Sequence, residues 1–574
     1  MVFSYIIFYK EVCLTRFLYA YFATIEKRGC KNIFKASRVV SAMLNKKLLF
    51  APWACRNKNY GSGQISEKIF RKIFKDLIVF DPQEVLYLNG REEMNRLFLE
   101  TVQKEQPDYI LLWLIYDEFS IETLLKIKEI SPKTKIMNFF GDDDALFYNF
   151  SRYYAPIIDC CFVAQTAFIK EYKKEGIKNP YRLVGVDVEY YKPLAVEKNF
   201  DVTFIGTPKT DRYKLIKFLI DNGIRVGIFG AGWDKHPDLK EFYRGALSKE
   251  ELVNTINQSK ISLSFTKNYE GKPHYKGRVV EISACRSFLI TEYFKGYYDL
   301  FSKDEIVMFN NEKDLLEKVK YYLHHEAKRE RIANRAYKRV LKNYSLEKEI
   351  RQAINSLERI QPKKVHFSTG KQALYLTVDE LKGTNDEIYK KVQDYEYVGF
   401  KERGSDALPY KDYLQIYSLE KSGKDISCCD YYVHSRFVGD YLGLLNAHYA
   451  CKTLDKSHFD SLIFLSQLVV KKGYFIKNLE DFRMYASTKN ISLDKNRIAF
   501  VSIPLLRVQN LKKIPENLIW GIYKPIFEDK LRPAYNAHGI FASAYLYKLL
   551  LFCIFTNKGF IIRRLLKKSG KVLA

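Results

Sequence analysis

The segment KGRVVEISACRSFLITEY, which runs from Lys276 to Tyr293, decides how the rest of the chain is interpreted. It begins with a basic cluster, Lys276-Gly277-Arg278, and reaches one carboxylate at Glu281. A small-residue turn, Ser283-Ala284-Cys285, then leads into a predicted apolar strand, Phe288 to Thr291. Lys and Arg neutralise phosphate oxygens, and a carboxylate accepts hydrogen bonds from paired hydroxyls. The segment therefore predicts a site for a ligand with phosphates and a diol, such as a nucleotide diphosphate sugar.

Two other parts of the chain extend this pattern. One is NFFGDDDALFYNFSRYYAPIIDCC, from Asn138 to Cys161, and the other is the helical run after Tyr293. Taken in order, these motifs resemble the glycosyltransferases of the CgeB (spore maturation protein) type, over roughly Lys46 to Ile360. The resemblance implies a GT-B fold of two facing Rossmann-like domains and transfer of a sugar from a nucleotide donor.

The resemblance also assigns one residue and leaves another position without a match. In GT-B enzymes with a Glu-x7-Glu motif the second Glu holds the ribose hydroxyls of the donor, and Glu281 matches that position. The first Glu falls at Pro273, so the donor-sugar contact is unassigned. Arg286-Ser287 replaces the small residues usual after the Ala-Cys step, so the local backbone is expected to differ.

Length and composition set the number and kind of domains. The chain has 574 residues, of which 47% are hydrophobic, enough for two to four globular domains. We predict an α/β protein of the GT-B fold: an N-terminal extension (1–45), an acceptor-side Rossmann-like domain (46–192), a nucleotide-sugar domain (198–345), a crossover helix (346–360), and a mixed α/β C-terminal domain with a basic amphipathic tail (361–574). Residues 1–42 are expected to be a peripheral extension or an over-called start.

Strand and helix patterns alternate through the first of these domains. Strands are predicted at 109–114, 135–140 and 157–164, with helices at 121–130 and 145–153 between them. Such alternation favours a parallel sheet covered by helices. In the C-terminal domain we predict helices near 437–450 and 459–470 and a strand at 497–504.

Three adjacent carboxylates, Asp142-Asp143-Asp144, end the strand predicted at 135–140. One interpretation is a helix N-cap, since acids suit the first turn of a helix. A second is a catalytic role for Asp143 or Asp144, as the general base for the acceptor hydroxyl. A third is a metal site. His274, before the basic cluster, is either a second catalytic residue, contacting phosphate or the departing sugar oxygen, or a surface residue.

The second domain supplies further donor-binding candidates. Gly206 and Gly230 each follow a predicted strand, where a backbone without a Cβ lets a nucleotide approach closely. Arg212, in the first turn of the next helix, is expected to add charge near the diphosphate. With Lys276, Arg278 and Glu281, they form the predicted donor site.

The formal charge of +27 favours an anionic partner. The last run, with Arg563, Arg564 and Lys567 among apolar residues, is typical of a helix on an anionic membrane face, although a packed helix with a basic tail stays open. Ten cysteines without a disulfide or zinc spacing fit a reduced compartment. We expect a cytoplasmic protein, peripheral at the inner membrane face, with no metal or other cofactor and no nucleic-acid partner.

The leading prediction is an enzyme, a hexosyltransferase that moves sugar from a nucleotide-sugar donor to a hydroxyl of a glycan, lipid-linked or protein acceptor, in polysaccharide or glycoconjugate synthesis. Two other classes stay open. One is a catalytically silent GT-B scaffold that binds a nucleotide or glycan, which the missing first Glu favours. The other is a nucleic-acid-binding protein, which only the charge supports.

Overall fold

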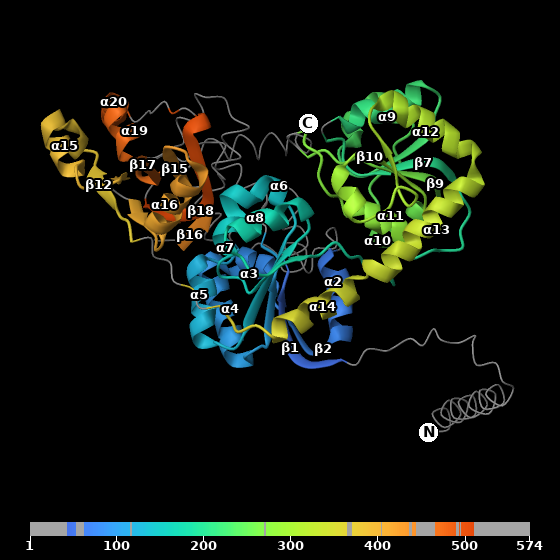
Figure 1. The fold of residues 1–574 in the computed structure, drawn as a ribbon, viewed down its shortest axis with the longest axis horizontal. Coiled ribbons are helices and arrows are strands. Elements are labelled where there is room, and N and C mark those ends of the chain that lie inside the picture. The colour runs from blue at the N-terminus through green and yellow to red at the C-terminus, as the bar shows by residue number, and fades with distance from the viewer. Residues whose placement is uncertain are drawn as a thin grey trace, which may run out of the picture. The chain divides into compact units, whose positions relative to one another are not determined.

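The computed structural model describes residues 43–52, 62–114, 118–209, 211–268, 271–363, 365, 370–402, 405–435, 439–442, 465–488, 493 and 495–509. They form three α/β regions, coloured from blue to cyan, from green to yellow, and from orange to red along the chain in Figure 1.

The first region is built on a six-stranded sheet in the order β2-β1-β3-β4-β5-β6. The pairs β1–β3, β3–β4, β4–β5 and β5–β6 are parallel. Every residue of β3 and β5 is buried, as a parallel sheet covered on both faces requires. The strands are β1 (Leu44–Ala51), β2 (Phe74–Val79), β3 (Tyr109–Leu112), β4 (Lys135–Phe140), β5 (Cys160–Val163) and β6 (Pro180–Arg182).

Local caps fix several helices of this region. Ser120 accepts from the Thr123 N–H at the start of α5, and Asp81 accepts from the Glu84 N–H at the start of α3. The helices are α2 (Ser62–Ile73), α3 (Pro82–Asn89), α4 (Arg91–Glu105), α5 (Ile121–Ile130), α6 (Asp143–Leu146), the π-helix η1 (Phe147–Ser151), α7 (Arg152–Tyr154), η2 (Thr166–Phe168) and α8 (Ile169–Lys174).

The second region contains a five-stranded sheet in the order β11-β10-β9-β7-β8, and all its pairs are parallel. The strand order reverses between β7 and β9, and open α/β sheets bind ligands beyond the carboxyl ends of the strands at such a reversal. The strands are β7 (Phe200–Ile205), β8 (Val226–Phe229), β9 (Ser259–Ser264), β10 (Leu289–Glu292) and β11 (Val307–Phe309).

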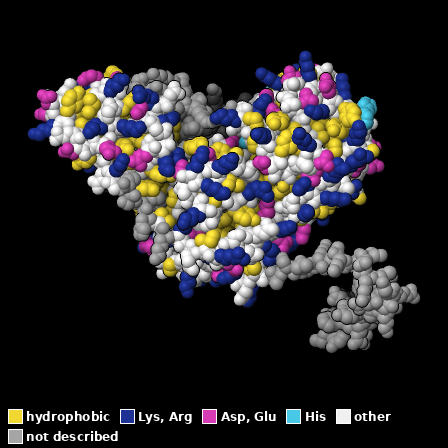
Figure 2. All heavy atoms as spheres, viewed as in Figure 1, with side chains coloured by type: hydrophobic (Ala, Val, Ile, Leu, Met, Phe, Trp, Pro, Cys, Tyr) yellow, Lys and Arg dark blue, Asp and Glu magenta, His cyan; other side chains and the backbone are white. Residues whose placement is uncertain are grey.

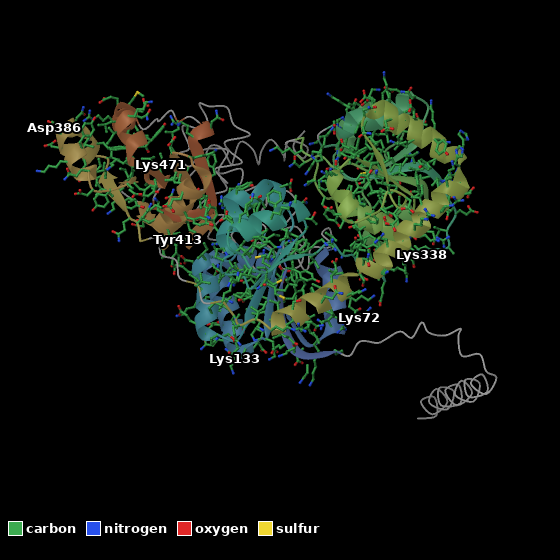
Figure 3. The ribbon with its side chains drawn as sticks, in the orientation of Figure 1. Lys72, Lys133, Lys338, Asp386, Tyr413 and Lys471 are labelled. Atoms are coloured by element: carbon green, nitrogen blue, oxygen red, sulfur yellow. The ribbon has the colours of Figure 1, made fainter. Side chains whose placement is uncertain are left out.

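Local caps and apolar stripes fix the helices of the second region. Ser248 and Glu251 form a capping box at the start of α10, and the basic helix α13 buries an apolar stripe that includes Ala336 and Val340. Figure 3 labels Lys338 on α13, where its side chain is exposed. The helices are α9 (Arg212–Asp221), η3 (Trp233–Lys235), η4 (Pro237–Leu239), α10 (Lys249–Asn257), α11 (Arg278–Ala284), η5 (Lys295–Asp299), α12 (Glu312–His324) and α13 (Glu326–Asn343).

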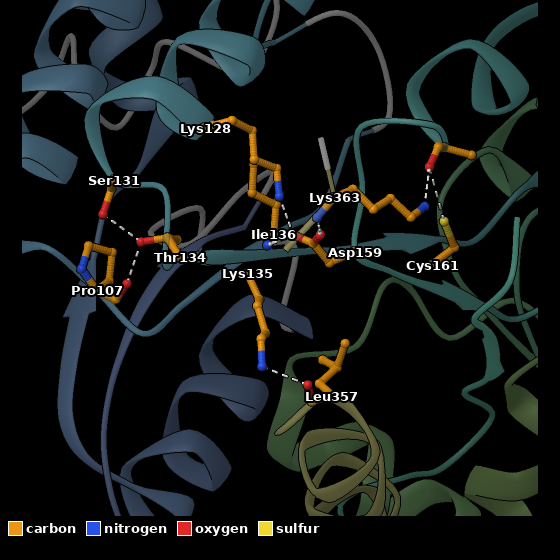
Figure 4. Close-up of polar contacts among 11 residues, drawn as sticks. Pro107, Lys128, Ser131, Thr134, Lys135, Ile136, Asp159, Cys161, Leu357 and Lys363 are labelled. Atoms are coloured by element: carbon orange, nitrogen blue, oxygen red, sulfur yellow. Dashed lines mark hydrogen bonds and ion pairs between the residues drawn. The ribbon is translucent and has the colours of Figure 1, made fainter. Parts of the chain in front are cut away.

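The next helix, α14 (Leu346–Glu358), returns to the first region. Lys135 Nζ donates to the Leu357 carbonyl oxygen at 2.7 Å (Figure 4), and Arg351 Nη2 donates to the Lys72 carbonyl oxygen at 3.1 Å. Two Rossmann-like domains followed by a helix that crosses back are the elements of the GT-B fold. The predicted fold class is confirmed.

The third region has a mixed sheet in the order β12-β13-β17-β15-β18-β14, with β16 paired to β15. Leu414, Cys429 and Val501 join the apolar core of the first region. The elements are β12 (Ala373–Thr377), η6 (Glu380–Lys382), α15 (Asn385–Val392), β13 (Tyr397–Lys401), β14 (Ser405–Ala407), α16 (Lys411–Ser422), β15 (Ile426–Ser435), β16 (Gly439–Leu442), η7 (Leu465–Gln467), β17 (Leu468–Lys471), α19 (Lys472–Lys477), α20 (Leu479–Thr488), η8 (Lys495–Arg497) and β18 (Ile498–Gln509).

Several predicted elements need correction. The described part of the helix predicted at 437–450 is the strand β16, and that of the helix predicted at 459–470 is the 3-10 helix η7 followed by the strand β17. Sheet pairing outweighs local propensity there. Ser283-Ala284 is not a turn but the end of α11. The N-terminal extension and the basic tail lie outside the described residues. Among the described residues, no helix has the length and apolar character needed to cross a bilayer.

Candidate active site

The loops at the β7/β9 reversal bring together two cations predicted from sequence, Arg212 and Lys276. Arg212 begins α9, and Lys276 ends the long loop after β9. Burial, followed by repulsion from Arg212, lowers the pKa of Lys276 to about 8. Burial likewise lowers the pKa of Arg212. The two side chains are therefore close enough to repel each other in partly desolvated surroundings.

Neither cation has a carboxylate partner among the described residues. Arg212 donates from Nη1 to the Thr207 carbonyl oxygen at 3.2 Å, but its buried Nε has no hydrogen-bond partner in the described part of the chain. A neighbouring cation, Lys267, shows the contrast, because it pairs with Asp211 and also with Glu292 at 2.9 Å. The same loops thus give Lys267 two ion-pair partners and leave the other two cations without one, although the charges of Asp144 and Asp142 reach Lys276. This arrangement suits an anionic ligand.

The two glycines of the predicted donor site touch each other. A Cβ at Gly230 would lie 2.5 Å from the Gly206 carbonyl oxygen, and the φ of Gly230 is +120°. That carbonyl oxygen also accepts from Trp233 Nε1 at 2.7 Å. Gly230 is therefore required by packing against Gly206, and its prediction as a ligand contact has no support here. Gly206 remains at the carboxyl end of β7, beside the reversal.

Arg278 and Glu281, also predicted for the donor site, lie one turn apart on α11. Arg278 Nη1 is 2.6 Å from Glu281 Oε2, and about a quarter of each side chain is exposed. Neither of these two atoms, nor the buried Tyr190 hydroxyl, has a hydrogen bond of good geometry within the described chain. Arg286, the departure noted in sequence, has a φ of +53° just after this helix. The Arg278–Glu281 pair thus keeps unused hydrogen-bonding capacity.

The three adjacent carboxylates of the first region have three different surroundings. Asp142 is the N-cap residue of α6, but its side chain makes no capping hydrogen bond, so the N-cap interpretation is wrong in that respect. Burial, followed by the charge of Asp144, raises its pKa. The described residues contain no group of His, Cys, Asp and Glu side chains arranged to hold a metal ion.

Asp143 was predicted as a catalytic residue, and the structure contradicts that role. Its side chain is 1% exposed, and the Tyr172 hydroxyl donates to its carboxylate at 3.0 Å. Burial raises the pKa of Asp143 to about 7 despite hydrogen bonds from Ser151 and Tyr172. It therefore serves the core of the first region, because it is the residue of α6 whose side chain is buried.

Asp144 faces the second region and contacts two residues of the loop after β9. Asn268 Nδ2 donates to Asp144 Oδ2 at 2.7 Å, and His274 Nδ1 lies 2.9 Å from the same oxygen. Burial opposes ionisation of Asp144, but the contact with His274 and the hydrogen bond from Asn268 lower its pKa. His274 Nδ1 makes no hydrogen bond of good geometry within the described chain. His274 is only 7% exposed, so its interpretation as a surface residue is wrong.

Sequence reasoning missed the residues that join the two sheets near this site. Gln165 directly follows β5, donates from Nε2 to the Tyr275 carbonyl oxygen at 3.1 Å, and accepts from the Tyr275 N–H at 3.0 Å. The Tyr275 hydroxyl donates to the Val184 carbonyl oxygen at 3.0 Å. The sequence offered one sign of a role for Gln165, a polar residue just after the carboxyl end of a predicted strand. No local pattern pointed to Tyr275.

Comparison with known proteins agrees with this geometry. A family model described as "Glycosyl transferase-like" matches residues 212–355, which include Arg212, His274, Lys276, Arg278 and Glu281. The chain is also 20% identical to the spore protein CgeB of Bacillus subtilis (strain 168) over 271 residues, 43% of this chain and 82% of CgeB. The predicted CgeB-like resemblance is confirmed.

Solved structures with a similar fold are more distant in sequence. Anabaena HepE in complex with UDP and glucose is 12% identical, with a TM-score of 0.41 over 55% of this chain and all of HepE. Sucrose-phosphate synthase from Thermosynechococcus elongatus is 11% identical, with a TM-score of 0.40 over 55% of this chain and 98% of the synthase.

Proposed function

We propose that this CgeB-like glycosyltransferase uses a nucleotide-sugar donor and transfers its hexose to a hydroxyl of a glycan, lipid-linked or protein acceptor. The observation that carries the proposal is the pair of unpaired, repelling cations, Arg212 and Lys276, at the β7/β9 reversal. A diphosphate would relieve their repulsion and supply the charged partners that the described chain lacks.

The donor would lie across the carboxyl ends of the second sheet, with its diphosphate on Arg212 and Lys276. As the bond between the anomeric carbon and the diphosphate breaks, negative charge grows on the leaving oxygen. Fixed cations stabilise that charge more strongly than water does, because they do not reorganise during the reaction. In this proposal side-chain cations, without a metal, neutralise the leaving nucleotide.

Glu281 would hold the ribose. Its Oε2 is buried without a hydrogen-bond partner of good geometry among the described residues, and a ribose hydroxyl can donate to it. Arg278 beside it has only donor groups, so Glu281 is the acceptor of the pair. Gly206 would provide close backbone approach at the end of β7.

Charge on the visible surface gives no support to the nucleic-acid alternative. In Figure 2, Lys and Arg side chains are spread over the face shown and lie among Asp and Glu, while α13 buries an apolar stripe in its own region. We propose that the transferase acts in the synthesis of a cell-surface polysaccharide or glycoconjugate, because the acceptors in such pathways carry the hydroxyl groups that the proposed reaction needs.

Titration calorimetry and thermal shift with UDP, GDP and their sugars test the proposal. A nucleotide at a hundred times its dissociation constant should stabilise the protein by about 2.7 kcal/mol. We expect Arg212→Met and Lys276→Met each to weaken binding at least tenfold. Lys260→Met is the matched control. Lys260 lies on β9 of the same sheet, and its Nζ is 2.7 Å from the Asp201 carboxylate, so it already has an acid partner. Equal affinities for all three variants would refute the donor site, whereas binding without any turnover would favour the scaffold alternative.

A further inference from the structure

Tyr148 has the largest exposed fraction, 57%, among the large hydrophobic residues in the described part of the chain. It lies on the π-helix η1, four residues after Asp144 of α6, so the two side chains project from the same side of neighbouring helical turns. Asp144 in turn accepts a hydrogen bond from Asn268 of the second region. The Tyr148 ring is therefore exposed one helical turn away from a contact between the first two regions.

Neighbouring side chains hold this ring in place without covering it. The guanidinium carbon of Arg152 lies over the Tyr148 ring, 5.7 Å from its centroid, in a cation–π contact. The rings of Phe147 and Phe168 approach Tyr148 in T-shaped geometry, with centroids 5.1 Å and 6.2 Å away. Since the guanidinium occupies one face, the exposed surface of the ring lies mainly on the other face.

The third region helps to hold the cation behind this ring. Arg152 also lies over the ring of Tyr417 on α16, 5.5 Å from its centroid, so the guanidinium stands between a tyrosine of the first region and one of the third. Glu175 pairs with Arg152 and accepts from the Tyr417 hydroxyl. Single exposed hydrophobic residues are common on protein surfaces. Tyr148 differs from them because two regions of the protein fix its orientation.

α16 also brings an aromatic ring and a cation to this junction. The Tyr413 ring, labelled in Figure 3, stacks on that of Tyr417 with centroids 6.0 Å apart, and it is partly buried. Lys421 Nζ lies 5.5 Å from the Tyr417 centroid, and 41% of the Lys421 side chain is exposed. The surface beside Tyr148 therefore continues from the first region onto the third.

The chemistry of this surface matches that of a sugar. A pyranose ring presents C–H groups on its faces, which pack on the negative face of an aromatic ring, and hydroxyls around its rim. Glu171 and Lys174 lie close enough for their charges to act on Tyr148, and they can accept from and donate to such hydroxyls. An anionic lipid surface fits less well, because it would repel Glu171.

We propose that the acceptor is an oligosaccharide, that one of its sugar rings stacks on Tyr148, and that its next units lie over α16 and contact Tyr413 and Lys421; this inference rests on the proposed transferase function. It selects a glycan chain from among the glycan, lipid-linked and protein acceptors. It also gives the third region a part in acceptor recognition. The end of the chain that receives the sugar would lie near Asp144, where the first two regions meet.

Titration calorimetry on the full chain with saturating UDP tests this site. The probes are maltohexaose, cellohexaose and chitohexaose, each compared with the disaccharide of the same linkage. We expect at least one hexaose to bind, and to bind about tenfold more tightly than its disaccharide, because only the longer chain reaches α16. Tyr148→Ala should weaken binding of both lengths by about tenfold or more, because the stacking face is lost.

Two further variants test the contribution of the third region. Lys421→Met removes a cation whose side chain is exposed, and Tyr413→Leu removes an aromatic face but keeps an apolar side chain in place. Each should weaken binding of the hexaose by about threefold or more and leave the affinity for the disaccharide unchanged. Both variants should bind UDP as tightly as the wild type, which shows that they are folded.

Two control variants separate stacking from other effects. Tyr148→Phe keeps the ring and loses the hydroxyl, so its hexaose affinity should stay within about threefold of the wild type. Tyr389→Ala removes a 37% exposed tyrosine of α15, a helix that packs on a separate apolar core of the third region. Its affinity for the hexaose should equal that of the wild type.

The outcomes distinguish this inference from the proposed function. Binding of UDP without binding of any hexaose, or equal hexaose affinities of Tyr148→Ala and the wild type, would overturn the oligosaccharide site and leave the donor site standing. Binding to phosphatidylglycerol vesicles that depends on Tyr148, with no binding of a hexaose, would overturn it in favour of a membrane contact. Failure of the wild-type chain to bind UDP, GDP or their sugars would overturn the proposed function and the acceptor role with it.

Discussion

Arg278 and Glu281 pair with each other on one turn of α11, with Nη1 and Oε2 2.6 Å apart. The sequence assigned one to the diphosphate and the other to the ribose. Pairing instead fixes the Glu281 carboxylate before any ligand arrives, so less rotamer freedom is lost on binding. In the proposed donor site, Arg278 would thus hold Glu281 ready to accept hydrogen bonds from the ribose.

Glu281→Ala should weaken binding of UDP about a hundredfold, because losing charged hydrogen bonds to two hydroxyls costs roughly 3 kcal/mol. Calorimetry with UDP and with 2′-deoxy-UDP isolates the ribose contact, since the variant should bind both equally. Glu330→Ala is the control, because Glu330 is a half-exposed partner of Arg286 at 3.6 Å on the same region. A preference for UDP over the deoxy analogue that persists in Glu281→Ala would contradict the assignment.

Donor binding should depend on pH through Lys276. Its pKa in the free protein is about 8, lowered from 10.5 by burial and by Arg212, and a bound diphosphate raises it again. Affinity for UDP should therefore fall above pH 8, by up to about tenfold per pH unit. Lys276→Arg should show no such fall between pH 8 and 9.5, because a guanidinium stays protonated. Calorimetry across this pH range measures UDP affinity for the wild type and for Lys276→Arg. If the affinities of the two proteins change with pH in the same way, Lys276 is not the titrating group.

Lys276→Met should bind UDP poorly yet unfold at a higher temperature than wild type. A lysine whose pKa falls on folding destabilises the native state while it is protonated, and that penalty disappears as pH rises through 8 to 10.5. The gain in Tm should therefore be present at pH 7 and absent at pH 11. Thermal unfolding at both values measures it, and a lower Tm at pH 7 would indicate a structural role instead.

Much of the first two sheets was predictable because apolar periodicity decides local structure there. The strand at 135–140 and the helix at 121–130 have the predicted bounds, since a buried parallel strand and a capped amphipathic helix are both strong local signals. Among the elements that the sequence did not reveal, β2 and α3 lack such local signals. Lys75 and Asp76 of β2 are exposed, and α3 is short. In the third region, β17 forms through pairing with β13 and β15, which are distant in sequence, and no local pattern reports this. β16 pairs antiparallel with the neighbouring strand β15, where a helix was predicted.

The candidate site was predictable residue by residue, but its contacts were not. Spacing alone could place Arg212, Lys276 and Glu281 near the ends of strands. It could not show that Asp143 turns into the core while Asp144 meets His274, because that depends on the helical start of α6 and on a loop more than a hundred residues away. The packing of Gly230 against Gly206 could not be foreseen for the same reason, since it depends on two strands that are separate in sequence.

Glu349 should make stability fall between pH 5 and pH 7. It is 4% exposed and accepts from the Gly185 N–H at 2.7 Å, where the chain passes between the first two regions. Burial raises its pKa from 4.5 to about 7 despite hydrogen bonds from Gly185 and Val184 and the charge of Arg182. The native state thus holds a proton that the unfolded chain has lost, and raising the pH from 5 to 7 should remove about 2 kcal/mol of stability.

Glu349→Gln isolates this effect, because its amide oxygen can accept the same backbone hydrogen bonds without ionising. Urea unfolding at pH 5, 6, 7 and 8 should show the variant gaining on wild type as pH rises and levelling off above pH 7. The pKa of Asp143 is also raised to about 7. Its titration changes the stability of the wild type and of the variant equally, so it cancels in the difference between their unfolding free energies. If the difference in unfolding free energy between Glu349→Gln and the wild type is the same at all four pH values, Glu349 is not the cause of the pH dependence.

Arg152 should anchor the third region to the first through a buried ion pair. Arg152 pairs with Glu175, at 5% and 8% exposure, and Tyr417 of α16 donates to the same carboxylate. Arg152→Met should destabilise the protein by about 3–5 kcal/mol, because Glu175 stays buried without its main cation. Arg152→Met with Glu175→Leu should recover most of that loss, since two apolar side chains leave no buried charge. Arg96→Met, at an exposed pair with Glu93, should leave stability almost unchanged. Urea unfolding gives all three values, and a double variant as unstable as Arg152→Met would show that the packing of Arg152 between Tyr148 and Tyr417, and not its charge, joins the regions.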